Sequence, residues 1–273
     1  MSTEPATRAM ISYHSADPSL SSSAKSKILE ETDTKDLLFT FTYFDIASCG
    51  STSRDMLVYG KAHYGAKYKF EAPSEKDWGE GKVPTAFSCL PMLKITAPNG
   101  VELDVSESMI VDIYLAERFN LLGDNKFESL TIQSIYANIH YLRERMFSVV
   151  TCAPKERLGP RRDNFFQNTL RKFLEDHEYH LKQNGDNGHY VGNKLSLADL
   201  HLANVIHYLQ TLPWGKMAEK AFRECPSVWK VKENVDKVAS LIPWRESDEF
   251  KLYEKNSIQW YSSLAVPEDK AEE

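Results

Sequence analysis

The sequence predicts an α+β domain followed by an all-α domain, and three observations lead to this fold class. Short runs rich in β-branched and aromatic residues occur between residues 37 and 105. A turn-forming Gly-Asp-Asn sequence follows at residues 123–125. Beyond it the strand signals stop, and apolar residues recur three and four positions apart, which is typical of one helix face. A chain of 273 residues is long enough for two such domains.

Composition and charge limit the classes of function. Apolar residues make up 42% of the chain and charged residues 26%, as in ordinary globular proteins. The net charge of −6, with both signs interspersed, argues against a nucleic-acid partner. No apolar run approaches the roughly 18 residues of a membrane span, and the start lacks a signal-peptide pattern. We therefore expect a cytoplasmic protein with no membrane partner.

The cysteines and histidines show no metal-binding pattern. The four cysteines are scattered without metal-ligand spacing, and none of the eight histidines has partners at such a spacing. Free thiols in a reducing compartment are therefore expected, with no metal site. The cysteines are Cys49, Cys89, Cys152 and Cys225.

Residues 1–36 are expected to form a disordered extension. They are rich in Ser, Thr, Ala and Lys and show almost no apolar periodicity. Such a segment cannot bury enough surface to offset the entropy lost on ordering. Acidic residues such as Glu4 and Asp17 argue against a mitochondrial transit peptide.

The first structured elements are expected from residue 37 onward. Residues 37–44 form an apolar run of strand length. A helix is expected to begin at Thr52 or Ser53 and to end at Gly65, because glycine is the usual residue just after a helix. A second strand around residues 68–70 is then parallel to the first, since a helical crossover separates them.

The segment from Phe87 to Ser108 organises the first domain. Pro91 cannot donate to a sheet ladder, so it belongs at the start of a strand, and the Leu90–Pro91 bond is a candidate for the cis isomer. A hairpin turn at residues 99–100 and a second strand follow. Ser106 is expected to cap the next helix, whose first amides suit a carboxylate. The exposed backbone at Leu90 therefore suits an extended, negatively charged peptide.

The order of these elements, β-α-β and then β-β-α, predicts a thioredoxin-like domain over residues 37–122. A linker is expected at 123–129, an all-helical domain at 130–242 and an aromatic tail at 243–273. The tail should pack on the body because it carries Trp244, Tyr253, Trp260 and Tyr261. Within the helical domain, Ser196 and Asp199 form a capping box, a pattern that marks a helix start. Further helices are expected near 132–142, 165–174, 216–224 and 226–240.

Several of these motifs carry a resemblance to a known family. Leu90-Pro91-Met92-Leu93, followed by Glu107-Ser108, resembles the glutathione-binding signature of the cytosolic glutathione transferases. The string from Gly192 to Asp199 resembles the capped helix in the helical domain of that family. Thr42-Tyr43-Phe44 with Arg54 eleven residues on, and Trp78, Lys82 and Pro91 at W-x3-K-x8-P spacing, are similar to the tyrosine-type, sigma-like members.

The resemblance implies the glutathione transferase fold and a dimeric detoxification enzyme with glutathione as co-substrate. It implies that Tyr43 activates the sulfur, that Trp78 and Lys82 hold the glycyl end, and that Leu90, before Pro91, pairs with the cysteinyl part. Glu107 and Ser108 are implied to hold the γ-glutamyl end. This role for Tyr43 is chemically reasonable, because a hydrogen bond from a hydroxyl stabilises a thiolate by about 1.5–3 kcal/mol. That lowers the thiol pKa, ordinarily about 8.5, by roughly one to two units.

One departure from the family pattern leaves alternatives open. The turn after Tyr43 contains Ser48 and Cys49, and Cys49 stands where the family has an arginine that polarises the thiolate. A helix start lowers a thiol pKa, so Cys49 could exchange disulfides with glutathione, or Ser48 could donate to its thiolate. The alternatives are a glutathione-dependent thiol transferase or isomerase and a non-catalytic ligand-binding protein of the same fold.

The apolar electrophile is expected between the Ile46-Ala47 loop and the first long helix. Candidate side chains on that helix are Tyr136, His140, Tyr141 and Arg145, with Trp244 or the aromatic tail as a lid. Residues at this helical spacing also suit a packed interface.

Overall fold

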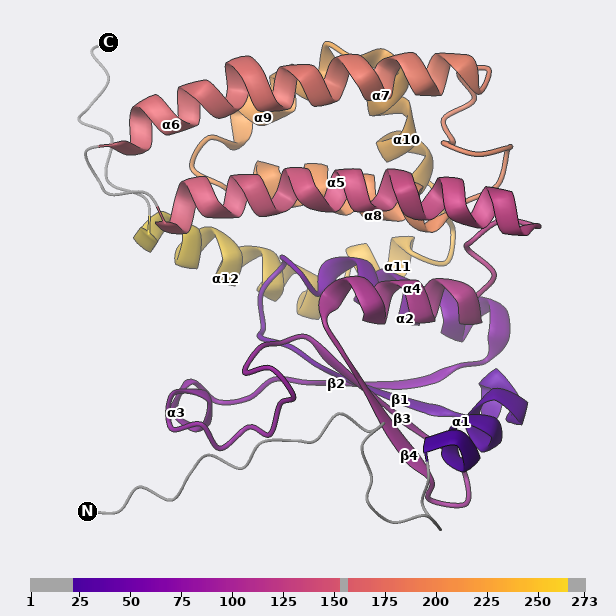
Figure 1. The fold of residues 1–273 in the computed structure, drawn as a ribbon. Coiled ribbons are helices and arrows are strands. Elements are labelled where there is room, and N and C mark those ends of the chain that lie inside the picture. The colour runs from indigo at the N-terminus through magenta and orange to yellow at the C-terminus, as the bar shows by residue number, and fades with distance from the viewer. Residues whose placement is uncertain (1–21, 153–156, 265–273) are drawn as a thin grey trace. The chain divides into compact units, whose positions relative to one another are not determined.

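The computed structural model describes residues 22–152 and 157–264 (Figure 1). Its contacts divide the chain into two units. The first, called here the α/β unit, comprises the described residues up to Asp45 together with Cys49–Phe119. The second, called the helical unit, comprises Ile46–Ser48 and the described residues from Asn120 onward. A short piece of the loop after the first strand thus groups with the helical unit.

The α/β unit is built on a four-stranded sheet. Its strands are β1 (Leu38–Thr42), β2 (Lys67–Glu71), β3 (Met92–Thr96) and β4 (Glu102–Ser106), in the order β2-β1-β3-β4. β1 is parallel to β2 and antiparallel to β3, and β3 is antiparallel to β4. The predicted parallel pair and hairpin are confirmed, and the strand expected to open at Pro91 begins one residue later, at Met92.

Two helices of this unit pack together. They are α2 (Ser51–Tyr64) and α4 (Ser108–Arg118), and a short helix, α3 (Glu75–Gly79), lies between β2 and β3 in the sequence. Gly65 ends α2 with φ of 68°, as predicted. The buried Ser53 hydroxyl donates to the Asp112 carboxylate at 2.5 Å and so joins α2 to α4. The thioredoxin-like fold is confirmed.

The start of α4 differs from the prediction. Ser106 was expected to cap this helix, but it is the last residue of β4, and Glu107 occupies the cap position without a side-chain cap bond. Glu107 has φ of 73° and ψ of 123°, outside the helical region. The strand therefore continues one residue beyond the expected end, and the chain turns at Glu107 instead.

The N-terminal region also differs from the expected disorder. Residues 22–36 contain α1 (Ser22–Glu31) and a 3-10 turn at Thr34–Asp36, whereas residues 1–21 lie outside the described part. Arg118, at the end of α4, donates to the carbonyl oxygens of Leu29 and Thr32, both at 2.7 Å. These bonds satisfy acceptors at the C-terminal end of α1, which a helix leaves without internal partners.

The helical unit consists of antiparallel and crossing helices. They are α5 (Lys126–Cys152), α6 (Leu158–Asn164), the π-helical segment η5 (Phe165–Leu170), α7 (Arg171–Gln183), α8 (Leu197–Gln210), α9 (Gly215–Arg223), α10 (Pro226–Asp236), α11 (Ile242–Arg245) and α12 (Asp248–Leu264). α5 begins inside the segment expected to be a linker. The capping box of α8 is present, with Ser196 and Asp199 bonded reciprocally. None of the described helices is long and apolar enough to cross a membrane.

The aromatic tail packs within the helical unit, as predicted. Tyr253 is 4% exposed and Tyr261 is fully buried, and both belong to α12. Trp244 on α11 is also buried and packs edge-on against Phe250 and Tyr253. Trp260 remains partly exposed.

Candidate functional site

Three predicted site residues stand in one row at one end of the sheet. Thr42 of β1 pairs with Met92 of β3, and Met92 pairs with Ser106 of β4. The adjoining residues at the same end of the sheet form the row of site residues: Tyr43 after β1, Pro91 before β3 and Glu107 after β4. Neighbouring strands lie about 4.8 Å apart, so these positions span roughly two strand spacings. The α/β unit thus brings the Tyr43 phenol, the backbone next to Pro91 and the Glu107 carboxylate to one end of the sheet.

Tyr43 is held by close packing. Its side chain is 5% exposed, and its backbone N–H donates to the Glu71 carbonyl at 3.0 Å. A Cβ atom on Gly50 would lie 2.6 Å from the Tyr43 ring, so only glycine allows this approach. The Arg54 guanidinium lies 5.5 Å from the centre of the ring. The ring is therefore fixed by the first turn of α2.

Arg54 supports the same end of β1 from within the unit. Its side chain is 3% exposed and donates to the Phe44 carbonyl at 2.7 Å. Its guanidinium also lies 5.9 Å from the ring centres of Phe41 and Phe70. A buried cation among three aromatic faces is stabilised by their negative quadrupoles. Arg54 therefore connects α2 to the strand that presents Tyr43.

The backbone at Leu90 is open to a ligand. The Leu90–Pro91 peptide bond is cis, as predicted. Leu90 precedes β3, and within the described residues its N–H and C=O make no hydrogen bond. An extended peptide can use such groups as a strand edge.

Glu107 and Ser108 lie at the start of α4. The Glu107 carboxylate accepts a hydrogen bond from the Cys89 thiol at 3.3 Å. Burial, and then this carboxylate, raise the pKa of Cys89 to about 11, so the thiol stays protonated at neutral pH. Ser108 is the first helical residue, and the first amides of a helix attract an anion. The pair therefore offers a carboxylate for a cation beside amides for an anion.

Trp78, on α3, packs beside the end of β1, and Lys82 follows α3 in the sequence. The Trp78 ring packs edge-on against Phe44, the residue after Tyr43, with ring centres 5.2 Å apart. Lys82 is exposed and forms ion pairs with Glu80 at 2.5 Å and with Asp77 at 3.9 Å. An incoming carboxylate would share or replace these contacts.

Ser48, by contrast, is engaged by the C-terminal helix. The Tyr261 phenol donates to the Ser48 hydroxyl at 2.9 Å, and the Ser257 hydroxyl donates to the Ala47 carbonyl at 2.7 Å. The Ala47 N–H donates to the Tyr253 carbonyl at 3.2 Å. Segment 46–48 is therefore built into the helical unit, whereas half-buried Cys49 returns to the α/β unit.

Two of the four candidates on α5, His140 and Tyr141, have different surroundings. His140 is buried, its ring stacks on His201 with centres 5.6 Å apart, and its Nε2 lies 3.2 Å from Arg143. Burial, and then Arg143, lower the pKa of His140 to about 3, so the ring is neutral. Tyr141 is exposed, and its hydroxyl accepts from Arg145 at 2.5 Å. The structure thus places His140 in the interior of the helical unit and Tyr141 on its surface.

Three features of these sites were not predicted. The packing of Gly50 on Tyr43 and the bond between Tyr261 and Ser48 involve partners that no local pattern identifies. Cys89 directly precedes Leu90, and this adjacency was the only available signal for its contact with Glu107.

Comparison with known sequences finds one family over half of the chain. A profile described as "Glutathione S-transferase, C-terminal domain" matches residues 111–248. Glutathione S-transferase A1 of Bos taurus is 26% identical over 173 residues, which cover 63% of this chain and 74% of that protein. A glutathione S-transferase of Anopheles gambiae is 23% identical and covers 70% and 89%, respectively. Against human glutathione S-transferase A1, the match covers only 54% of the relative's length, at 28% identity.

Comparison with solved structures finds the same fold. Prostaglandin synthase D of Nilaparvata lugens matches with a TM-score of 0.66 and 18% identity, over 77% of this chain and 98% of that chain. The sigma class enzyme of Fasciola hepatica matches with a TM-score of 0.62 and 20% identity, over 79% and 100%. At these identities the likeness concerns the fold.

Proposed function

The chain belongs to the glutathione S-transferase family, and we propose that it binds glutathione along the row of Tyr43, Pro91 and Glu107 and ionises the thiol for attack on apolar electrophiles. The sheet register carries this proposal, because it brings the three positions to the ends of adjacent strands. A tripeptide is an extended ligand that can reach across such a row.

The binding contacts follow from the chemistry of each position. The cysteinyl part pairs with the open backbone of Leu90, as a strand adds to an edge. The γ-glutamyl ammonium meets the Glu107 carboxylate, and its carboxylate meets the Ser108 hydroxyl and amide. The glycyl carboxylate meets Lys82 beside Trp78. Because Lys82 is exposed, replacing its ion pair with Glu80 by one with the ligand costs little free energy.

In the proposed reaction, Tyr43 is the group that ionises the thiol. Its phenol donates a hydrogen bond to the sulfur, which favours the thiolate over the thiol. A bond of about 1.5–3 kcal/mol lowers the thiol pKa by roughly one to two units. Binding both reactants at one site then removes much of the entropic barrier to attack.

The electrophile is proposed to approach segment Ile46-Ala47, with exposed Tyr141 as a further contact. Two hydrogen bonds between Ala47 and α12, and a third from α12 to the neighbouring Ser48, fix the position of this segment. His140 is not a proposed electrophile contact, because its ring is buried against Tyr136 and His201. We also propose a cytoplasmic homodimer, as in the family, which sedimentation equilibrium and fractionation would test.

Conjugation kinetics with glutathione and an activated aryl chloride test the role of Tyr43. Tyr43→Phe should lower kcat/KM at least tenfold and raise the pKa of bound glutathione, read from thiolate absorbance. Tyr179→Phe is the matched control, since Tyr179 is an exposed tyrosine on α7. A loss confined to Cys49→Ala would instead indicate thiol exchange. Binding of glutathione with no turnover of any electrophile would indicate a carrier.

A further inference from the structure

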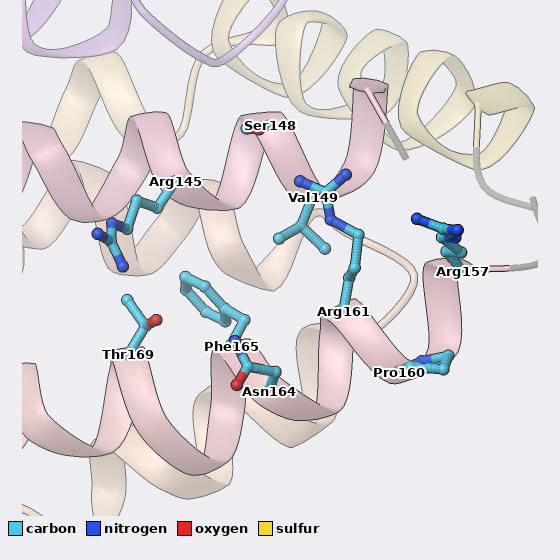
Figure 2. Close-up of a pocket in the computed structure, with 9 residues that line it drawn as sticks. All are labelled: Arg145, Ser148, Val149, Arg157, Pro160, Arg161, Asn164, Phe165 and Thr169. Atoms are coloured by element: carbon cyan, nitrogen blue, oxygen red, sulfur yellow. The ribbon is translucent and has the colours of Figure 1, made fainter. Parts of the chain in front are cut away.

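A cavity of about 610 Å³ lies within the helical unit, between the C-terminal half of α5 and the α6–η5 segment (Figure 2). Its volume is in the range of small-molecule sites. None of the glutathione-site residues named above lines it. The lining is therefore separate from the proposed glutathione contacts, although Arg145 donates to Tyr141, the proposed further contact of the electrophile.

Three arginines line this cavity. Arg145 comes from α5, Arg161 from α6, and Arg157 precedes α6. Figure 2 shows the Arg145 and Arg161 guanidinium groups on either side of the Phe165 ring. Within the described ranges none of the three forms an ion pair with a carboxylate, and Arg145 bonds only to the neutral Tyr141 hydroxyl.

Within the described ranges, two neighbouring arginines outside the cavity do have acidic partners. The chain has a net charge of −6, so carboxylates are in excess. Nearby arginines on the same run of helices are paired, Arg162 with Asp163 and Arg171 with Glu175. Three like charges around one space repel one another, and an anion placed among them relieves that repulsion. A multiply charged anion does so better than a single carboxylate.

The wall opposite α5 has an unusual backbone. Residues Phe165–Leu170 form a π-helical segment between α6 and α7. Such segments are rare and occur frequently at functional sites. This one supplies Phe165 and Thr169 to the lining. The irregular turn therefore shapes the cavity wall.

The remaining lining defines the chemistry of a ligand. Ser148, Asn164 and Thr169 add neutral hydrogen-bonding groups. Val149, Pro160 and Phe165 add apolar surface. Guanidinium groups match phosphate oxygens in paired hydrogen bonds, and a phosphate monoester carries close to two negative charges at neutral pH.

We propose that the cavity between α5 and the α6–η5 segment is a second binding site, for a small phosphate monoester that carries an apolar or aromatic group. Arg157 and Arg161 bind the phosphate, and Arg145, on the other side of the Phe165 ring, adds positive charge to the same cavity. The apolar group packs on Phe165 and Val149.

Isothermal titration calorimetry of the full chain with phenyl phosphate tests this site. Phenyl phosphate should bind more tightly than either inorganic phosphate, which lacks the ring, or benzoate, which carries one charge. Replacing both Arg157 and Arg161 by Gln should weaken phenyl phosphate binding at least tenfold. The matched control, Arg171→Gln, removes an exposed arginine that is paired outside the cavity and should leave affinity within twofold.

Arg145→Gln, on the opposite wall, provides a second variant if the double variant unfolds, as checked by circular dichroism. It should also weaken binding several-fold. The proposal is overturned if phenyl phosphate gives no heat of binding or if benzoate binds equally well. It is also overturned if Arg171→Gln weakens binding as much as the cavity variants do.

Discussion

The phenol of Tyr261 donates a 2.9 Å hydrogen bond to the hydroxyl of Ser48, a residue 213 positions earlier in the chain. Tyr261 is fully buried and Ser48 is 8% exposed. With the two bonds between α12 and Ala47, the last described helix fixes the segment that follows the first strand. Ser48 is therefore part of the packing of the helical unit, which favours Tyr43 as the donor to the glutathione sulfur.

Replacing either partner of this bond should affect stability more than chemistry. Tyr261→Phe and Ser48→Ala should each lower the free energy of unfolding by about 1 kcal/mol, the usual net value of one hydrogen bond. Both should keep kcat/KM for conjugation within about threefold of wild type. Urea unfolding and steady-state kinetics measure the two effects.

Ser263→Ala is the control on the same helix, because that exposed hydroxyl bonds only to the local Trp260 carbonyl. It should change neither quantity measurably. A large loss of conjugation in Ser48→Ala, without loss of stability, would show that Ser48 acts on the sulfur and would contradict the assignment of Tyr43.

Gly50→Ala should disable Tyr43 without touching its hydroxyl. The added Cβ would lie 2.6 Å from one ring atom of Tyr43 and 3.2 Å from Phe41, so the ring must shift. Overpacking of this kind costs about 1–3 kcal/mol. We expect kcat/KM to fall about tenfold, with the pKa of bound glutathione moving toward that of free glutathione.

Gly159→Ala is a suitable comparison, because nothing lies within 4 Å of the added Cβ on that glycine. Its kinetics should match wild type. Unchanged activity in Gly50→Ala would mean that the ring position of Tyr43 does not control thiolate formation.

Glu107→Gly should separate binding from stability. Glu107 has φ of 73°, a conformation that glycine adopts without the strain imposed by a Cβ atom. The free energy of unfolding should stay unchanged or rise by about 1 kcal/mol. The KM for glutathione should rise, because the partner of the γ-glutamyl ammonium is removed.

Glu102→Gly, by contrast, should lower the free energy of unfolding. Glu102 is an exposed residue of β4, where glycine costs about 0.5–1 kcal/mol and removes no proposed ligand contact. If Glu107→Gly bound glutathione as tightly as wild type, the proposed place of the γ-glutamyl group would be wrong.

Local signals predicted the strands and turns that carry Tyr43, Pro91 and Glu107, but not that the three positions lie together at one end of the sheet. A proline, a hairpin turn and a helix-ending glycine each restrict the backbone over a few residues, and together they set the sheet register. The cap of α4 was misplaced by one residue, since serine is favoured at caps and the unusual backbone of Glu107 has no local signal.

Most of the features that the sequence did not predict depend on contacts between residues far apart in the chain. α1 depends on Arg118, which lies 86 to 89 residues later, and Ser48 depends on Tyr261. The arginine-lined cavity depends on a π-helical segment, which no periodicity predicted. Such features come from packing between distant segments, whereas sequence patterns report local preference.

Buried neutral histidines should make the helical unit sensitive to acid. His177 is 5% exposed, and burial, with His180 as a smaller cause, lowers its pKa to about 3. Its ring nitrogens lie 2.5 Å from the Tyr190 hydroxyl and 3.0 Å from the Asn138 side-chain oxygen. Burial likewise lowers the pKa of His140 to about 3 and that of His201 well below its ordinary value.

The folded-state pKa of His177 is below its unfolded value of about 6.5, so the unfolded state binds more protons between these two pH values. Its contribution to stability is therefore fully present above pH 6.5 and is lost as the pH falls toward 3. Each such histidine contributes a slope of up to about 1.4 kcal/mol per pH unit to the free energy of unfolding.

Urea unfolding of wild type at pH 7.5, 5.5 and 4.5 should show this decline in stability. His177→Gln should reduce the slope by about one histidine's share, whereas His63→Gln, at an exposed position on α2, should not. Equal slopes in wild type and His177→Gln would show that His177 takes up its proton without opposing the fold.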